Sequence, residues 1–315
     1  MISIIIPNFN GSVHLETCFD SLLRQSIRNF SIILVDNNST DDSVKFTRTN
    51  YPDVKIIQLD HNFGFSKTVN DGIKYSMEDP DNRFIVLLNN DVECKEDFIE
   101  QMVKGFINKE TGSVACKMLN FDDHKIIDNA GLFMDLKDLP LLRGYKESDT
   151  GQYDKPEYIF GACAGAGIYR REVFENIGLF DEDFFAYHED MDFNIRMQYY
   201  GYKCYYNPKA VCYHKGSSTS GSNSNFKIFL CEKNILLLRL KNYPVNVLIS
   251  HSFFFFYYGA KRYIRYYLDG NLSNISSALK GFLKGINQSV STIKKRKELK
   301  KIQKVSFKDI KFFPN

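Results

Sequence analysis

The chain has 315 residues, of which 43% are hydrophobic and 25% charged, and a net charge of +3. This composition fits one large globular domain with an appendage, or two modest domains, and it excludes disordered, collagen-like and multi-span membrane proteins. The charge is unevenly divided, because residues 226–315 carry 18 lysines and arginines against 4 acidic residues, whereas residues 1–225 carry 23 against 34. A Ser/Gly/Asn-rich run over 216–224 marks the expected boundary between a domain of residues 1–225 and an extension of residues 226–315.

The start of the chain shows no secretory signal. Met1 leads directly into Ile2-Ser3-Ile4-Ile5-Ile6, without a basic region or a small-residue cleavage site. The seven cysteines contain no C-x-x-C pair, and their odd number argues against a complete disulfide framework or a zinc knuckle. We therefore expect a reducing, cytoplasmic setting.

The first third of the chain alternates short apolar runs with amphipathic stretches. The runs predicted as strands are Ile2–Pro7, Ser31–Asp36, Val54–Leu59 and Phe84–Leu88. The stretches with helical spacing are His14–Gln25, Asp41–Asn50 and Ser66–Glu78. This alternation predicts an α/β fold, built from βαβ units with a parallel sheet covered on both faces. Ligands of such sheets bind beyond the carboxyl ends of the strands, so those ends hold the candidate site residues.

Polar residues rich in Asn and Asp follow all four predicted strands. They are Pro7-Asn8-Phe9-Asn10, Asp36-Asn37-Asn38-Ser39, Asp60-His61-Asn62-Phe63-Gly64 and Asn89-Asn90-Asp91. A single tip of this kind is explained by a turn or a helix cap. Four tips at the same edge favour a shared polar pocket.

Two common phosphate-binding loops are missing from these tips. No G-x-G-x-x-G follows the first strand, so a dinucleotide site lacks its glycines, and Gly64-Phe65-Ser66-Lys67-Thr68 lacks the glycine that precedes the lysine of a P-loop. The acidic tip of the fourth strand fits another solution, in which a carboxylate holds a divalent metal that neutralises a diphosphate.

Several segments in a fixed order carry a resemblance to a known family. They are Ile4–Asn10, Leu34–Ser43, Asn62–Gly72, Leu87–Val92, Gly178–Asp192 and Asn207–His214. Together they resemble the motifs of family-2 inverting glycosyltransferases, and the last two resemble the rhamnosyltransferase-like branch. The resemblance covers roughly residues 2–220. It implies a GT-A fold with a mostly parallel, Rossmann-like nucleotide-binding sheet, a nucleotide-diphosphate sugar donor and a divalent cation.

The resemblance places the sugar nucleotide at the strand tips. The residues expected to bind it are Pro7, Asn8, Asp36, Asn37, Gly64, Lys67, Asn89 and Asn90. Asp36 or Asn37 would bond the pyrimidine edge or the ribose, and the two adjacent polar residues leave that choice open. Gly64 would let the backbone approach the nucleotide closely. Lys67 would meet a phosphate, with a solvated helix lysine as the equal alternative.

The resemblance also implies the metal ligands. Asn89-Asn90-Asp91 stands where the family carries its D-x-D motif, so Asp91 supplies the only full negative charge. Fewer carboxylates predict weaker metal affinity, with the donor diphosphate completing the coordination. His214 matches a metal-coordinating histidine of the family, although a lone histidine is more often structural. Imidazole with carboxylate suits Mn²⁺ better than Mg²⁺, and both stay open.

An inverting transfer requires a base that deprotonates the acceptor hydroxyl. Glu189, Asp190 and Asp192 cluster at the start of a helix expected to reach about Tyr200. The resemblance assigns the base to Asp190, and Glu189 would bond acceptor hydroxyls or support the loop. The alternative is that acids merely favour a helix N-terminus, and for Asp192 we expect a structural pair with Arg196.

The basic tail contains the apolar stretch Val245–Ala260, followed by Lys261, Arg262 and Arg265 among tyrosines. At about 16 residues and interrupted by polar side chains, the stretch is shorter than the roughly 20 residues that span a bilayer. The pattern favours an interfacial helix on anionic lipid. A helical lid on the catalytic domain and a homodimer helix are the alternatives, and no nucleic-acid-binding module accompanies the charge.

These observations predict a metal-dependent inverting glycosyltransferase, peripheral on the inner face of the membrane. It would transfer a sugar to a hydroxyl of a saccharide or lipid-linked saccharide acceptor in cell-surface glycan synthesis. The branch resemblance favours dTDP-L-rhamnose as donor, with a UDP-hexose as the alternative. A nucleotidyltransferase on a similar sheet and a degenerate, membrane-attached scaffold are the competing functions, the latter because of Asn89.

Overall fold

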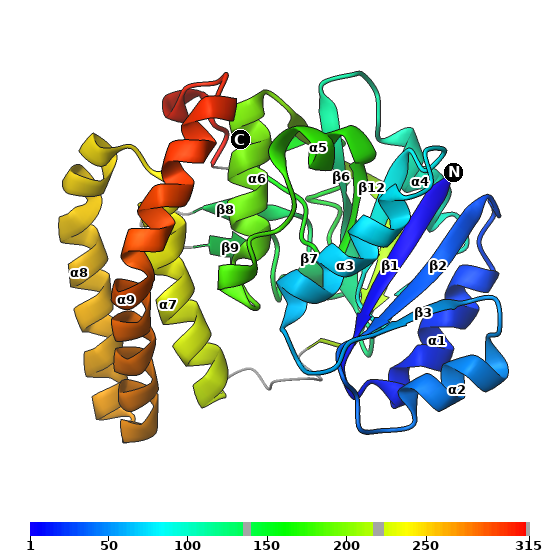
Figure 1. Ribbon diagram of the computed structural model, residues 1–315, viewed down its shortest axis with the longest axis horizontal. Coiled ribbons are helices and arrows are strands. Elements are labelled where there is room, and N and C mark those ends of the chain that lie inside the picture. The colour runs from blue at the N-terminus through cyan, green and yellow to red at the C-terminus, as the bar shows by residue number, and fades with distance from the viewer. Residues whose placement is uncertain (135–139, 217–223, 313–315) are drawn as a thin grey trace.

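The structure is a computed structural model that describes residues 1–134, 140–216 and 224–312. Its strands are β1 (Ile2–Asn8), β2 (Phe30–Asp36), β3 (Lys55–Gln58), β4 (Phe84–Leu88), β5 (Val92–Cys94), β6 (Thr111–Asn120), β7 (Ile127–Asn129), β8 (Leu132–Met134), β9 (Pro140–Leu142), β10 (Glu157–Ile159), β11 (Ala166–Arg170) and β12 (Lys203–His214). Its α-helices, shown with the strands in Figure 1, are α1 (Ser12–Leu23), α2 (Ser43–Asn50), α3 (Phe65–Met77), α4 (Phe98–Lys104), α5 (Arg171–Ile177), α6 (Glu189–Tyr200), α7 (Asn225–Asn242), α8 (Val245–Leu268) and α9 (Leu272–Ile302).

One large sheet runs through the described residues in the order β10-β12-β6-β11-β4-β1-β2-β3, with β5 beside β12 and β7 beside β6. Strands β1 to β4 are parallel to their neighbours in this set. Strand β11 enters antiparallel between β4 and β6, and β12 is parallel to β6. The sheet is therefore mixed, with a parallel first half built from βαβ units.

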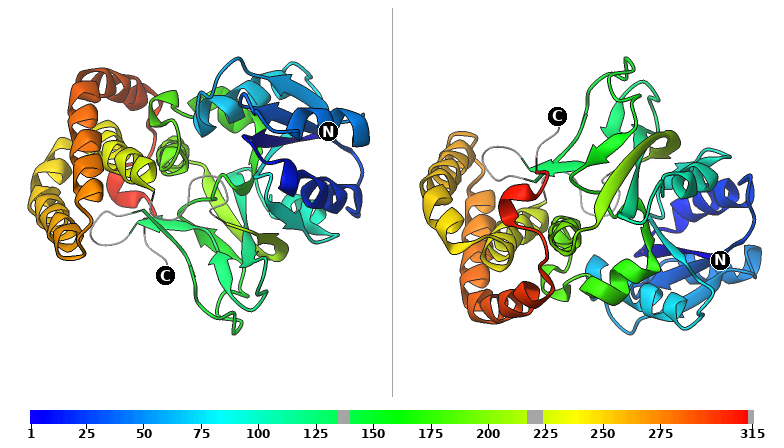
Figure 2. Two further views of the ribbon diagram at one scale, coloured as in Figure 1. Left: turned by 90° about the horizontal axis from the view of Figure 1, so that it is seen from below. Right: turned by 90° about the horizontal axis from the view of Figure 1, so that it is seen from above.

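Helices cover both faces of the sheet, as the two views of Figure 2 show. Successive side chains of a strand point to opposite faces, so Ile4 and Ile6 pack on the side of α1 and α4. Ile5 packs on the side of α3, α5 and α6. This two-sided burial explains why the strands are apolar at consecutive positions, and it confirms the predicted α/β class.

The predicted elements of the first third are all present, with ends that move by no more than two residues. Strand β12 is long and runs from Lys203 to His214. Its register shifts between Asn207 and Val211. Pro208, which has no N–H to donate to the ladder, lies within that interruption.

Helices α7 and α9, which follow residue 224, pack against α6. Ile235 and Leu238 of α7 share a buried cluster with Met191 and Ile195 of α6. Helix α8 lies at the outer edge in Figure 1 and contributes no buried residue. Residues 217–223 of the expected boundary run lie outside the described residues, and the division at residue 225 stays a prediction.

We find no helix, within the described parts of the chain, that is long and apolar enough to cross a membrane.

Candidate active site

The tips of the parallel strands are joined by side-chain hydrogen bonds. The Asn8 amide donates to the Asp36 carboxylate at 2.9 Å, and the Asn90 amide donates to the Asn8 side-chain oxygen at 2.7 Å. The Asn37 amide donates to the Asn62 side-chain oxygen at 2.8 Å. All four tips enter this network and therefore lie at one end of the sheet, while the shared polar pocket expected there stays a prediction.

Asp36 and Asn37 are both buried and already engaged with the protein. Asp36 accepts hydrogen bonds from the Ser39 hydroxyl at 2.6 Å and the Ser39 backbone N–H at 3.0 Å. Asn37 accepts one from the backbone N–H of Phe63 at 2.9 Å. The edge is therefore rigid before any ligand binds, and the choice between Asp36 and Asn37 as nucleotide ligand stays open.

Gly64 begins α3 with φ of +82°, a conformation that favours glycine. A Cβ there would lie 2.5 Å from a ring carbon of Phe185, and the N–H of Ser66 donates to the Phe185 carbonyl at 3.0 Å. Phe185, in the loop before α6, thus fills the space beside Gly64. The contact of Gly64 with a nucleotide stays a prediction. Lys67 forms an ion pair with Asp71 on the same helix.

Strand pairing brings Asp91 and His214 together, because β5 runs antiparallel beside the end of β12 with Val92 opposite His214. The His214 Nε2 lies 3.3 Å from Asp91 Oδ1. Its Nδ1 lies 2.9 Å from a carboxylate oxygen of Asp128 on β7. Burial alone lowers the pKa of His214, but the bonds to Asp128 and Asp91 outweigh it and raise that pKa to about 10.

This arrangement fits a divalent metal. A metal-ligating imidazole usually has its far nitrogen held by a carboxylate, as Asp128 holds His214. Asp91 supplies the anionic oxygen beside the other nitrogen. No group of three or more His, Cys, Asp or Glu side chains able to hold a metal occurs among the described residues. The protein ligands would therefore be few, and a bound diphosphate would have to complete the coordination.

Asp128 and His14 are the site residues that sequence reasoning missed. Asp128 lies on β7, and nothing in its local sequence pattern distinguishes it. His14 on α1 is close enough to Asp91 and Lys215 to respond to both charges. Burial lowers the pKa of His14, the charge of Asp91 raises it, and Lys215 lowers it again.

Asp190 lies half-buried at the start of α6, where its Oδ1 accepts a hydrogen bond from the Met191 N–H at 2.8 Å. Burial raises the pKa of Asp190 to about 6, against the lowering by backbone hydrogen bonds from Met191 and Ala164. A carboxylate with that pKa is mostly ionised near neutral pH yet binds a proton more readily than an exposed aspartate.

The segment around Cys163 connects Asp190 with the other acidic residues. Burial raises the pKa of Cys163, and the charges of Asp190 and Asp128 add to the increase. Two residues later, the carbonyl of Gly165 accepts a hydrogen bond from the N–H of Asn89 at 2.8 Å. The tip that carries Asp91 and the helix end that carries Asp190 therefore flank one short segment.

The loop before α6 has an unusual backbone. Phe185, Tyr187 and His188 adopt φ of 66°, 69° and 67°, and bulky residues rarely occupy this left-handed region. Strain of this kind persists only where the surroundings hold it, and it clusters at functional sites.

Helix α7 supplies that hold. The Asn234 amide donates to the carbonyls of Phe184 at 2.9 Å, Ala186 at 2.8 Å and Tyr187 at 2.7 Å. Lys233 donates to the carbonyl of Asp183 at 2.5 Å. The tail thus fixes the loop that leads to Asp190. No local sequence pattern indicates this contact.

Glu189 differs from its neighbour. It is 6% exposed, and its Oε2 has no hydrogen-bond partner within the described structure. Burial raises the pKa of Glu189 well above its usual range, and the charge of Asp190 adds to this. Glu189 is thus a buried carboxyl that binds a proton more readily than an exposed glutamate.

Asp192 is structural, as expected. Its carboxylate pairs with Arg196 Nε at 2.8 Å. It also binds Lys241 at 2.9 Å and the Asn242 amide at 2.9 Å, both from α7. Lys241 reaches Asp181 at 2.7 Å as well. Basic residues of the tail therefore neutralise Asp181 and Asp192, which lie in the segment Gly178–Asp192.

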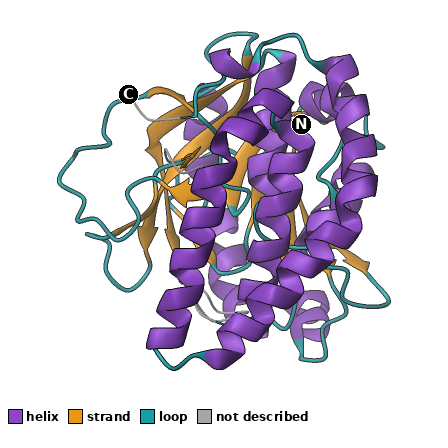
Figure 3. Cartoon of the chain, turned by 90° about the vertical axis from the view of Figure 1, so that its left-hand side faces the viewer, coloured by secondary structure: helices purple, strands orange, loops and turns teal. Residues whose placement is uncertain are grey.

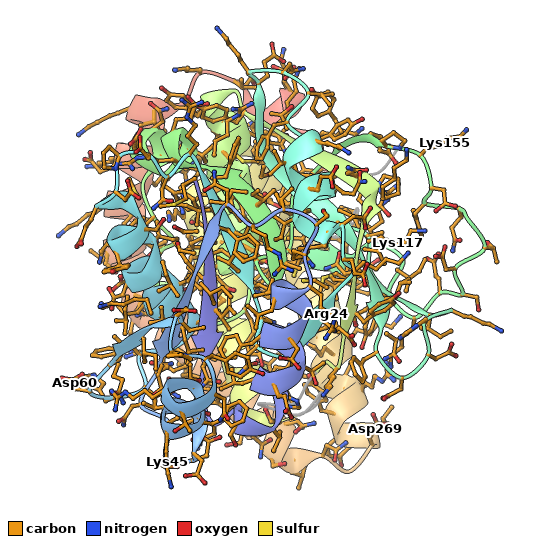
Figure 4. All side chains as sticks on the ribbon, turned by 90° about the vertical axis from the view of Figure 1, so that its right-hand side faces the viewer. Arg24, Lys45, Asp60, Lys117, Lys155 and Asp269 are labelled. Carbon is orange, nitrogen blue, oxygen red and sulfur yellow. The ribbon has the colours of Figure 1, made fainter. Side chains whose placement is uncertain are left out.

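Two cavities lie away from these residues. One of about 440 Å³ is lined in part by Lys117, Asp149 and Tyr213. Another of about 390 Å³ lies beside Arg48. Lys117 is already ion-paired with Asp149 at 2.9 Å, and Figure 4 places it on the side of the molecule opposite Asp60, which follows β3. Neither lining includes a predicted site residue.

Comparison with known sequences identifies the family. The sequence profile of Glycosyl transferase family 2 matches residues 3–178. The O-antigen biosynthesis protein RfbC of Myxococcus xanthus is 27% identical over 210 residues, which is 64% of this chain but 16% of that protein. The N-acetylglucosaminyl-diphospho-decaprenol L-rhamnosyltransferase of Mycobacterium tuberculosis is 24% identical over 241 residues, covering 70% of this chain and 78% of that enzyme.

Solved structures support the fold. A mannosyltransferase from Pyrobaculum calidifontis, in complex with GDP-Man and Mn²⁺, superposes with a TM-score of 0.56 at 13% identity, covering 96% of this chain and 85% of that one. GalNAc-T7 with UDP, GalNAc and Mn²⁺ gives a TM-score of 0.61 at 16% identity, covering 76% of this chain and 48% of that one. At such identities the likeness establishes the GT-A fold alone.

Proposed function

Since this chain belongs to glycosyl transferase family 2, we propose that it transfers a sugar from a nucleotide-diphosphate donor to a hydroxyl of a saccharide or lipid-linked saccharide, with inversion. The single observation that carries the proposal is the meeting of Asp91, Asp128 and His214 at one end of the sheet, joined through the Cys163 segment to Asp190.

In this proposal the strand tips bind the donor, and Asp91 and His214 hold Mn²⁺ or Mg²⁺. A bound divalent cation would neutralise the leaving diphosphate. Asp190 removes the proton of the acceptor hydroxyl, and the hydroxyl oxygen forms a bond to the anomeric carbon. The bond from that carbon to the diphosphate oxygen breaks on the opposite face, and its electron pair leaves with the nucleoside diphosphate. Glu189, which is buried, supports the loop beside the base.

Membership of a glycosyltransferase family argues against the nucleotidyltransferase alternative. A nucleotidyltransferase would release diphosphate from a nucleoside triphosphate, whereas a glycosyltransferase releases a nucleoside diphosphate from a sugar nucleotide. We further propose dTDP-L-rhamnose as the first donor to test, since the mycobacterial relative carries an L-rhamnosyltransferase name. A UDP-hexose is the second. A role in cell-surface glycan synthesis follows the names of these relatives.

A panel of sugar nucleotides, each with and without Mn²⁺, tests the function. The true donor should raise the melting temperature only with the metal, since a ligand that binds the native state stabilises it by mass action. The same donor should be slowly hydrolysed to nucleoside diphosphate. Stabilisation without hydrolysis or transfer would leave the degenerate scaffold as the better description.

A further inference from the structure

Helices α8 and α9 form an outer surface of the described molecule that has no role in the proposed function. Helix α8 has 24 residues, and none of them is buried. Its exposed side chains are largely apolar, with Ile249 69% exposed, Phe253 70% and Phe256 64%. Spacings of three and four residues put these three on one helix face. Single exposed apolar residues are normal, whereas a continuous patch of large ones marks an interaction site.

Helix α9 continues the surface. The members of its apolar stripe recur every three or four residues, and they are Leu279, Leu283, Ile286, Val290 and Ile293. Figure 3 views this side of the molecule and shows it covered by helices. We call the exposed apolar faces of α8 and α9 the outer helical face.

The inner side of α8 is anchored, which fixes the direction of the outer helical face. The guanidinium of Arg239 on α7 lies 4.4 Å from the ring centroid of Phe255. Arg262 pairs with Glu232 of α7 at 2.6 Å. Successive residues of a helix are turned by about 100°, so Phe253 and Phe256 lie on other sides of α8 than Phe255, and both are exposed.

The charges around the outer helical face select the partner. Lys261 lies among its apolar residues on α8, and Lys280 and Lys284 alternate with the stripe of α9, all three being exposed. Two copies of this face would bring like charges together, which disfavours a homodimer. Apolar and aromatic side chains edged by lysine and arginine match an anionic lipid surface, where the rings enter the headgroup boundary and the cations meet phosphates.

We propose that the outer helical face docks on an anionic bilayer, with α8 and α9 lying in the plane of the interface. The docking proposal deepens the proposed function, and what it implies about the acceptor rests on that function. Docking there would bring the protein to the surface in which a lipid-linked acceptor lies, which favours such an acceptor over a free saccharide.

Flotation of the full chain with lipid vesicles tests the docking. The wild type should float with vesicles that contain phosphatidylglycerol and much less with phosphatidylcholine alone. The double variant Phe253→Ser/Phe256→Ser should lose about tenfold in vesicle partitioning, because its lost rings are the ones that would be buried. Lys280→Glu/Lys284→Glu should lose binding selectively on the anionic vesicles.

The matched control is Val13→Ser, since Val13 is 77% exposed on α1, far along the chain from this surface. It should float like the wild type. All variants should keep the wild-type melting temperature and donor stabilisation, which separates a docking failure from a failure of the proposed function. Equal flotation of wild type and double variant would overturn the proposal. So would a wild-type dimer that ignores vesicles and that the double variant converts to monomer.

Discussion

Asp190 is the residue on which the proposed chemistry depends. We expect Asp190→Asn to keep the metal-dependent thermal shift with donor and to lower the transfer rate by about a thousandfold, because the amide cannot accept the acceptor proton. Asp192→Asn is the matched control, since Asp192 is a buried structural partner of Arg196 and Lys241. It should lower the melting temperature instead. Normal transfer by Asp190→Asn would remove the base from this position.

The pKa of Asp190 also predicts a pH dependence. The base works only when ionised, so kcat/KM should fall about tenfold per pH unit below pH 6 and level off above it, with a pKa raised to about 6 by burial. Because that pKa is raised from 3.8 on folding, the ionised carboxylate costs stability above pH 6. This cost disappears as the pH falls toward 4. An acid limb centred near pH 4 in the kcat/KM profile would contradict the assignment.

Asp128 is a positioning residue for His214 in this account. Asp128→Asn should weaken Mn²⁺-dependent donor stabilisation by about 10- to 100-fold in metal concentration, because it removes the carboxylate that orients the imidazole. Titration of the thermal shift with Mn²⁺ at fixed donor measures this. Asp123→Asn, an exposed change in the same segment, should leave the titration unchanged. An unaltered midpoint in Asp128→Asn would detach Asp128 from the metal site.

At the scale of elements, α7 serves the loop before α6. We expect Asn234→Ala to destabilise the fold by about 2 kcal/mol, because the variant leaves the loop carbonyls of Phe184, Ala186 and Tyr187 without their donor. Transfer should fall further than donor binding, since the loop leads to Asp190 and the donor tips lie on other elements. Denaturant unfolding and single-turnover kinetics separate the two effects.

Asn246→Ala on α8 is the control for that experiment, because Asn246 is exposed and lies on another helix. It should leave both the stability and the transfer rate unchanged. If Asn234→Ala lowered stability but transferred at the wild-type rate, the loop would not depend on α7 for its active geometry.

At the scale of the whole molecule, the tail and the first 225 residues are joined by both packing and charge. The cluster around Ile195 and Leu238 is apolar, and Lys241 and Lys295 reach Asp181. We therefore expect a protein of residues 1–225 to lose its cooperative unfolding transition and to bind a hydrophobic dye, as measured by calorimetry and dye fluorescence. A folded fragment with an unchanged melting temperature would make the tail a separate domain.

Taken alone, the sequence was sufficient for the order of the elements in the first third of the chain, since periodicity and strand-end composition are local properties. Ile4, Ile5 and Ile6 are apolar in succession because both faces of β1 are covered, and that pattern is readable without coordinates. Ordered motifs likewise pointed to Asp91, Asp190 and His214. Local sequence also explained the pair of Asp192 with Arg196, because a separation of four residues on a helix places side chains together.

Only the tertiary structure revealed the partners of those residues. Asp128 reaches His214 across 86 positions of the chain, and Asn234 reaches Tyr187 across 47. No periodicity in the sequence predicts either contact, because strand pairing and helix packing bring these residues together. The sequence of the tail likewise does not separate its two kinds of basic residue. Some pair with buried acidic residues, and others are the exposed lysines of the outer helical face. The charge and hydrophobicity of each residue can be read from the sequence. The packing of the helices decides which side chains face the core and which face outward.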